Sequence, residues 1–336
     1  MDRDRVKTIA DIARIAGVSK ATVSRALNDS PLLSAETRER VRAVAREHGF
    51  EMNDSARRLS LRQSNVIALV TYRYEPNEDV PDAFLLEIMS GLGAGLHAGG
   101  YDLLLIQIAA GDTNWIARYL DSGRVDGFVL LSASCTEEHL HTLEARGAPF
   151  VVWGRKSDSG SFSTVTGDSF AGGRMATEHL LRAGRGRIAF IGGFAQEHEV
   201  RDRYRGYVAA LAALGIELDE SLVAYGDYTP ESGAAKMREL LERHSDLDGA
   251  FVCSDLMAIA AVDELRAQGR SVPQDVAVVG YDDIAIAAHS DPPLTTIRQP
   301  GPLVGRLLAQ SVITRVTTGA VTHVSIPAEL VVRVSA

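Results

Sequence analysis

The sequence predicts an α/β protein in which a small three-helix headpiece precedes two doubly wound α/β lobes. The first fifty residues carry three short amphipathic helical patterns, whereas from residue 65 short apolar runs alternate with helical segments. The length of 336 residues is too great for one ordinary core. We expect a headpiece over residues 1–50, a linker over 51–64, and a two-lobed domain over 65–336.

The headpiece pattern predicts helices over roughly residues 8–15, 19–27 and 35–48. A hydroxyl residue precedes each one and can accept a hydrogen bond from the first turn: Thr8, Ser19 and Ser34. Apolar residues at helical spacing predict one small shared core, made of Ile9, Ile12, Ala13, Val18, Val23, Leu27, Val41, Val44 and Ala45.

The first two helices form a helix-turn-helix pattern, in which Gly17 permits the tight turn and the second helix presents a polar, cationic face. Arg25 can make a bidentate contact with guanine, while Lys20 and the hydroxyls suit base edges or phosphates. A helical hairpin buried in a core is the alternative, and the cationic outer face argues against it. The residues of this segment expected to meet DNA are Thr8, Ser19, Lys20, Ala21, Thr22, Ser24, Arg25 and Asn28.

The distribution of charge supports a DNA-binding headpiece although the whole chain has a net charge of -9. Residues 1–62 hold 13 Lys or Arg against 9 Asp or Glu, and the rest of the chain holds 22 against 35. A basic segment on an acidic body indicates that only the small part meets a polyanion. On charge alone, a solvated basic helix face explains the pattern equally well.

The pattern of residues 65–336 predicts two series of buried parallel strands. Continuous apolar runs separated by helices, such as 84–98 and 170–183, are typical of strands covered on both faces. Ligands of such folds bind at the carboxyl ends of the strands. The predicted strands are 66–70, 103–108, 125–131 and 150–153 in the first series, and 188–191, 223–225, 250–253 and 276–279 in the second.

Motifs spread along the chain, in this order and spacing, resemble those of the lac repressor/gal repressor family of transcription regulators. The resemblance implies a body similar to a periplasmic sugar-binding protein, whose chain crosses between lobes near residues 166, 295 and 321. It places residues 65–166 with 296–321 in the first lobe and 167–295 with 322–336 in the second. It also implies a homodimer on a pseudo-palindromic double-stranded operator. The motifs are Gly17-Val18-Ser19-Lys20-Ala21-Thr22-Val23-Ser24-Arg25, Gly280-Tyr281-Asp282-Asp283 and segments 8–13, 34–41, 178–180, 187–193, 206–207 and 293–300.

The family resemblance also assigns roles in the linker. A leucine of the hinge helix, here Leu59, inserts into the minor groove. The energy cost of unstacking the base pairs there is offset because the bent DNA contacts more of the protein surface. Arg57 and Arg58 then hold neighbouring phosphates. Met52-Asn53 stands where the family usually has Pro-Asn, and Asp54-Ser55 where Ala-Leu is common. Packing of Leu59 on the body is the alternative.

Effector contacts carry over from the family to Arg203 and Asp282, which we expect to face one another across the cleft and grip vicinal hydroxyls. A structural ion pair or a helix cap is the alternative for each. Tyr228 occupies a position where the family often has an aromatic residue. Further candidates are Tyr72, Asp82, Trp153 and Ser254. The loop 71–83 either contacts a larger glycoside or is a surface loop with no role in binding.

Other classes of function find weaker support. Gly93-Ala94-Gly95 matches a loose dinucleotide pattern but lies inside a predicted helix, Gly167-Asp168-Ser169 lacks a nucleophile elbow, and His139 and His141 stand two apart on a helix. We therefore expect no enzyme, cofactor or metal site. The nearest alternative is a regulator of nucleoside or purine response, and distant ones are a sugar-processing enzyme and a solute-binding protein.

The sequence predicts a cytoplasmic chain without a membrane segment. It has no run of eighteen apolar residues, and its charged first residues lack the apolar stretch of a secretory signal. Its two cysteines, Cys135 and Cys253, lie in or beside apolar strands, where a buried thiol is the commoner role.

Overall fold

A computed structural model describes residues 8–27, 32–50, 63–72, 83–109, 112, 114–132, 135–157 and 160–336. Contacts within the chain divide it into two units, residues 1–64 and 65–336.

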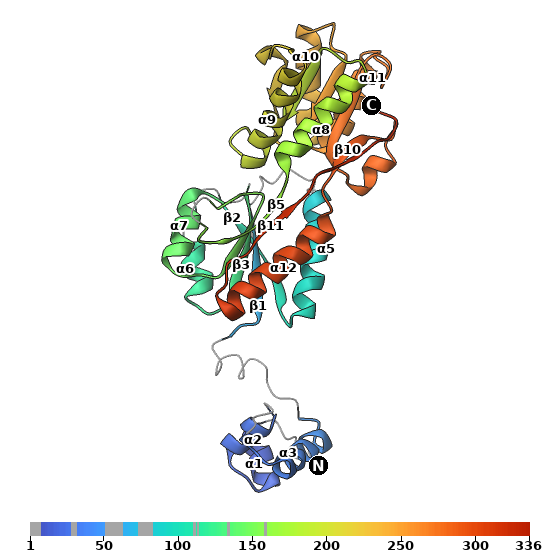
Figure 1. Cartoon of the computed structure of the whole chain (residues 1–336). Helices are drawn as coiled ribbons and strands as arrows, with labels where there is room; N and C mark the ends of the chain where they lie inside the picture. Colours follow the sequence, from blue (N-terminus) through green and yellow to red (C-terminus); the bar gives the residue numbers. More distant parts are fainter. Residues whose placement is uncertain are drawn as a thin grey trace. The chain divides into compact units, whose positions relative to one another are not determined.

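The first unit contains the three predicted helices, α1 (Ile9–Ala16), α2 (Lys20–Leu27) and α3 (Ala35–Glu47) (Figure 1). Thr8 forms a capping box with Asp11, and Gly17 ends α1 in the left-handed conformation at φ 65°. The Ser19 hydroxyl accepts a hydrogen bond from the Thr22 amide at 3.1 Å. Ile12, Val23 and Val41 are fully buried in one core, so the predicted helices, caps and core are confirmed.

The first lobe is built on a six-stranded sheet in the order β11-β5-β4-β3-β1-β2, whose pairings are parallel. Along β1 the side chains alternate: Ile67 and Leu69 pack toward α5 and α12, whereas Ala68 and Val70 pack toward α6 and α7. The elements are β1 (Val66–Tyr72), α5 (Ala83–Ala98), β2 (Asp102–Ile108), α6 (Trp115–Leu120), β3 (Gly127–Leu131), α7 (Glu137–Ala145), β4 (Phe150–Trp153), β5 (Ser163–Gly167), α12 (Gly301–Thr318) and β11 (His323–Ile326).

The second lobe repeats this plan with the strand order β12-β10-β9-β8-β6-β7, in which only the described β10–β12 pairing is antiparallel. Helices α8 and α9 cover one face and α10 and α11 the other (Figure 1). The elements are α8 (Ser169–Arg182), β6 (Ile188–Gly192), α9 (His198–Ala213), η2 (Glu220–Leu222), β7 (Val223–Tyr225), α10 (Pro230–Arg243), β8 (Gly249–Val252), α11 (Asp255–Ala267), β9 (Ala277–Asp282), η3 (Ala285–Ala288), β10 (Thr295–Arg298) and β12 (Glu329–Val331).

The chain passes between the lobes at residue 168, at 299–300 and at 327–328. The two predicted crossings near 295 and 321 are therefore wrong by a few residues. β10 pairs with β9 and belongs to the second lobe, while β11 pairs with β5 and belongs to the first. Both strands have only four residues, and their Thr, Ser, Arg and His side chains give a weak apolar signal.

Candidate functional site

The outer face of α2 carries the side chains expected to read DNA. Lys20, Ala21 and Arg25 are exposed, Thr22 and Ser24 are half-buried, and Val23 and Ala26 face the core. Because one face of α2 packs on the core and the other is polar and exposed, the polar face can enter the major groove of DNA. Ser19 and Thr8 are exposed, and their hydroxyls also cap helices.

Several predicted contacts lie outside the described residues. These are Asn28, Arg57, Arg58, Leu59, Asp82, most of the loop 71–83 and the side chain of Tyr72, whose backbone ends β1.

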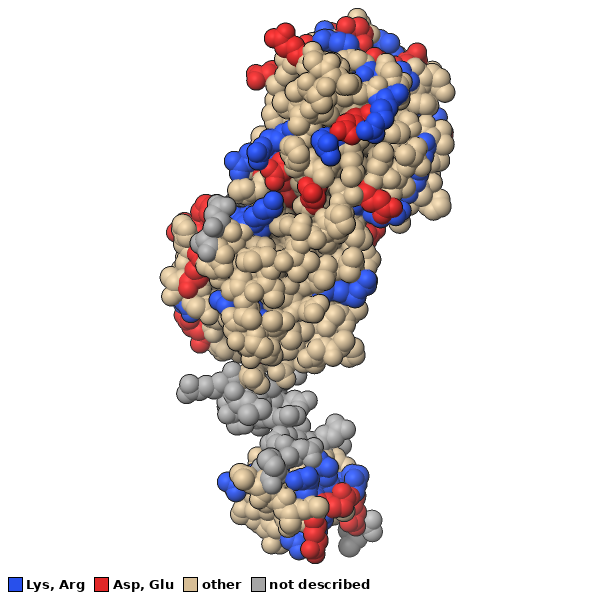
Figure 2. Space-filling view, in the orientation of Figure 1, with Lys and Arg blue, Asp and Glu red and all other residues tan. Residues whose placement is uncertain are grey.

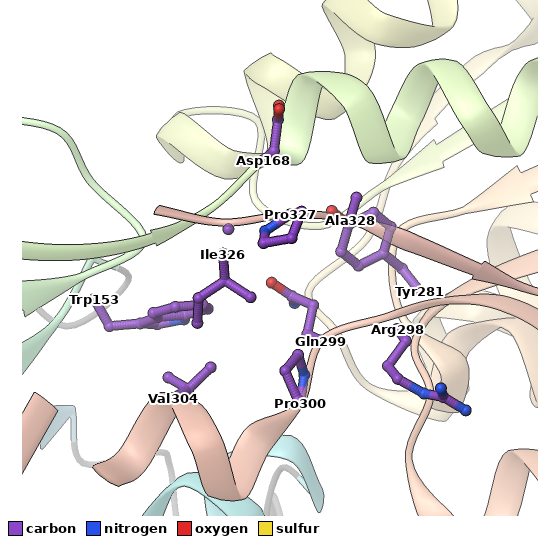
Figure 3. Close-up of a pocket in the computed structure, with 11 residues that line it drawn as sticks. Trp153, Asp168, Tyr281, Arg298, Gln299, Pro300, Val304, Ile326, Pro327 and Ala328 are labelled. Atoms are coloured by element: carbon purple, nitrogen blue, oxygen red, sulfur yellow. The ribbon is translucent and has the colours of Figure 1, made fainter. Parts of the chain in front are cut away.

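A pocket lies at the junction of the two lobes, where the three crossing segments meet (Figure 3). Trp153, at the end of β4, lies near Ile326 and Val304, and these side chains give the pocket an apolar wall. Gln299 extends from the second crossing segment, whereas the Arg298 guanidinium points away. Trp153, a predicted effector contact, is buried in the wall of this pocket, and its ring centroid is 6.0 Å from that of Phe84.

Arg203 is a buried cation that packs against Tyr281, one of the residues lining this pocket. It projects from α9, is 4% exposed, and donates from Nη1 to the Cys253 carbonyl at 2.8 Å. Its guanidinium carbon lies 3.7 Å from the centroid of the Tyr281 ring. Burial opposes its charge, but Tyr281, Tyr228 and Cys253 hold the pKa of Arg203 above its ordinary value. Its Nε atom is buried without a hydrogen-bond acceptor among the described residues.

Close packing of α9 on α8 fixes where Arg203 lies. A side chain at Gly173 would overlap the backbone carbonyl of Arg203, and one at Gly206 would overlap the carbonyl of Phe170. Glycine is needed because the two helix backbones meet there. The packing therefore fixes the position of the Arg203 backbone relative to α8.

Asp282 ends β9 with a left-handed backbone at φ 113°, and its carboxylate accepts a hydrogen bond from the Gln299 amide at 2.8 Å. Arg203 and Asp282 both belong to the second lobe. The expectation that they face one another across the cleft is therefore wrong, because α9 and β9 lie in the same lobe. Gln299 places this carboxylate beside the crossing segment that lines the pocket.

Tyr228 has a left-handed backbone, at φ 70°, and its hydroxyl donates to the Glu197 carboxylate at 2.5 Å. Burial first, and then Glu197, raises the pKa of Tyr228 well above its ordinary value. Its ring covers Gly193, where any side chain would overlap it. The ring is thus packed within the second lobe.

Ser254 is buried at the start of α11, where its side chain makes no capping hydrogen bond. Its neighbour Asp255 is fully buried and accepts from the Thr296 hydroxyl at 2.6 Å and the Ile284 amide at 3.0 Å. Burial raises the pKa of Asp255 to about 7. Asp255 therefore links α11 to β10 inside the second lobe.

Sequence reasoning missed the acidic residues of α9. Glu197 precedes the helix and Glu199 lies in its first turn, with its carboxyl group against Gly154 of the first lobe. Acidic residues are common at helix N-termini, so the sequence carries no signal for this contact.

Gly95 and His139, which belong to the motifs of other function classes, have structural roles. Gly95 lies inside α5, where a side chain would press on Ala309 of α12. His139 is buried: its Nδ1 accepts from the Thr136 amide, and its Nε2 lies 3.1 Å from the Asp112 carbonyl. Among the described residues there is no group of three or more His, Cys, Asp or Glu able to hold a metal ion. Within the described part of the chain no helix is both long and apolar enough to cross a bilayer.

A helix-turn-helix unit precedes a two-lobed unit with a pocket at the lobe junction, a combination typical of ligand-responsive DNA-binding regulators. Residues 8–53 match the family "Bacterial regulatory proteins, lacI family", and residues 177–336 match "Periplasmic binding protein-like domain".

Known proteins match along nearly the whole chain. The HTH-type transcriptional regulator CelR of Thermobifida fusca is 41% identical, with 94% of each chain covered. The ribose operon repressor of Escherichia coli K12 is 33% identical over 92% of this chain and 93% of that protein.

Solved structures agree with these matches. The CelR–cellobiose complex matches with a TM-score of 0.75 at 38% identity, covering 98% of this chain and 99% of that one. A lac repressor dimer bound to operator and an anti-inducer matches with a TM-score of 0.83 at 25% identity, covering 98% of each chain. The chain belongs to the lacI family of bacterial transcription regulators, which confirms the predicted resemblance and fold class.

Proposed function

We propose that this regulator is a repressor of carbohydrate-utilisation genes whose operator affinity is controlled by a sugar or glycoside bound at the lobe junction. The observation that carries the proposal is Arg203: a buried cation with an unsatisfied Nε, beside the Asp282 carboxylate, at the carboxyl ends of strands. Charged donors and acceptors of this kind bind neutral hydroxyl groups strongly.

Cellobiose is the first effector to test, because a similar regulator has been solved in complex with it. In the proposed site, Arg203 and Asp282 hold hydroxyls, and Trp153 offers an apolar ring to one sugar face. Tyr228, Ser254, Tyr72 and Asp82 complete the set of proposed contacts. The role is binding alone, without turnover of the sugar.

On the DNA side, Lys20 and Arg25 of α2 enter the major groove, with Thr8, Ser19, Ala21, Thr22, Ser24 and Asn28 around them. The segment 51–64 acts as hinge, with Leu59 in the minor groove and Arg57 and Arg58 on phosphates. Residues 1–50 form the headpiece and 65–336 the effector domain.

The acting species is a homodimer, since two half-sites multiply the discrimination that one small headpiece provides. The first lobe offers a surface for it. The face of the first lobe in view in Figure 2 is largely uncharged, whereas the second lobe carries both signs. Leu86 of α5 is 51% exposed and Leu303 of α12 is 38% exposed, and a second copy of the chain would cover them.

A ligand screen by thermal unfolding of the full chain tests the effector class, because a ligand that binds the folded state raises the melting temperature. We expect cellobiose or a related glycoside to raise it and to be recovered unchanged. A shift produced by nucleosides or purines, with none from sugars, would replace the carbohydrate effector by the nearest alternative. Formation of a sugar product would overturn the binding-only role.

A further inference from the structure

Glu199 lies on α9 in the second lobe, yet its carboxyl group lies against the first lobe. It fills the space over Gly154, where any side chain would overlap its oxygens, and the Ser132 hydroxyl makes a hydrogen bond to it. Ser132 and Gly154 directly follow the adjacent strands β3 and β4. Gly154 has a left-handed backbone at φ 84°, so both its conformation and its neighbour favour glycine. The carboxyl group therefore bridges the two lobes.

The groups around this bridge come from both lobes. Glu197, Arg203 and Tyr228 approach it from the second lobe, and the Cys135 thiol approaches from the first. Next to Gly154, Arg155 forms an ion pair with Glu137. Burial raises the pKa of the nearby Cys135 thiol, and the two charges of this pair also influence that pKa.

These surroundings favour the uncharged carboxyl. Burial is the largest cause, the neighbouring Glu197 adds to it, and Arg203 opposes them, so that the pKa of Glu199 rises to about 8. At neutral pH the bridging group is mainly the protonated acid.

We propose that Glu199 is a proton-dependent bridge between the lobes, and that an effector entering the junction displaces it and releases its proton. This inference rests on the proposed function, in which a sugar binds at that junction. A displaced carboxyl group becomes hydrated and returns toward its ordinary acidity, so its O–H bond breaks and the proton passes to the buffer. Effector binding is then stronger at high pH, where the proton has already been lost.

Calorimetry of cellobiose binding to the full chain tests the linkage. Titrations at pH 7 and pH 9, each in two buffers of different ionisation enthalpy, count the protons exchanged. We expect release of about one proton per chain at pH 7, almost none at pH 9, and about tenfold tighter binding at pH 9. Binding to the unaltered protein without proton release at pH 7 would overturn the proposal without any variant.

Two amide variants identify the group. Glu199→Gln keeps the shape of the side chain but cannot ionise, so its cellobiose affinity should be equal at both pH values. Glu197→Gln, at the residue that precedes this helix, is the matched control: it removes the neighbouring charge, so the pH dependence should persist with its midpoint moved to lower pH. A Glu199→Gln variant with the same pH dependence as the unaltered protein would assign the proton elsewhere and contradict the bridge.

A ligand-free arm separates this inference from the choice of effector. The pKa of Glu199 is raised from 4.5 to about 8 in the folded chain, so its contribution to stability is lost as pH rises between these two values. From about pH 5 to 8 the melting temperature of the unaltered protein should therefore fall relative to that of Glu199→Gln, and above pH 8 the difference should stay constant. Parallel profiles would refute the bridge, whereas failure of cellobiose to bind either protein would refute only the effector class.

Discussion

Replacement of Arg203 by methionine separates an effector-binding role from a structural one. In the ligand-free protein the change removes the hydrogen bond to the Cys253 carbonyl and the contact with the Tyr281 ring. A carbonyl left unpaired costs about 1–3 kcal/mol, and a desolvated cation–π contact contributes about 2 kcal/mol. Removing a buried cation also relieves a desolvation cost of several kcal/mol. These terms offset one another, so the free energy of unfolding should change by less than about 2 kcal/mol.

The effect on effector binding should be larger. A hydrogen bond to a charged group contributes about 1.5–3 kcal/mol, and the Nε atom of Arg203 is buried without an acceptor among the described residues. A loss of roughly 3 kcal/mol corresponds to about a hundredfold weaker binding.

The assay is calorimetry with cellobiose, paired with chemical unfolding of the same samples. Arg203→Lys is the matched control, because it keeps the positive charge but loses the planar guanidinium group. Its affinity for cellobiose should lie between those of the unaltered chain and Arg203→Met. An Arg203→Met protein that unfolds normally and binds cellobiose within threefold of the unaltered chain would refute the assignment.

Three further changes test the headpiece and the second lobe. Arg25→Ala should relax base preference in a selection from random duplexes, whereas an unchanged selected sequence would count against the groove assignment. Gly173→Ala should lower the free energy of unfolding by about 1–3 kcal/mol, since its Cβ would overlap the Arg203 carbonyl. Gly93→Ala, with open space around it, should not destabilise; equal effects would refute the packing argument. Asp255 has a pKa raised from 3.8 to about 7, so the stability that it provides is lost as pH rises between these two values. Asp255→Asn should flatten the melting profile between about pH 4 and 7, and an unaltered slope would assign the pH dependence to another group.

The parts of the fold that sequence predicts are those with local signals. Thr8 and Gly17 mark the ends of α1 by capping chemistry alone. The eight predicted strands are continuous apolar runs, and the structure contains a strand within or across each of them. β5, β10, β11 and β12 were not among these runs, because short strands with polar residues depend on their partners for stability.

The candidate site was less predictable because its contacts join distant segments. Chain order already places Arg203 and Asp282 between the first two crossings, so their common lobe follows once those crossings are known. The contact of Glu199 with Gly154 has no such signal, since it depends on how the two lobes meet. Resemblance identified the buried arginine but gave no indication of this acidic group.

The central claim is that ligand at the lobe junction controls reading of DNA by the headpiece. The direct measurement is the affinity of the full chain for its selected operator, by fluorescence anisotropy at fixed salt, with and without saturating cellobiose. Coupling between two sites typically amounts to about 1–3 kcal/mol. We therefore predict a 5- to 150-fold change in operator affinity on addition of the sugar. Saturated binding of cellobiose with no change in operator affinity would contradict the account.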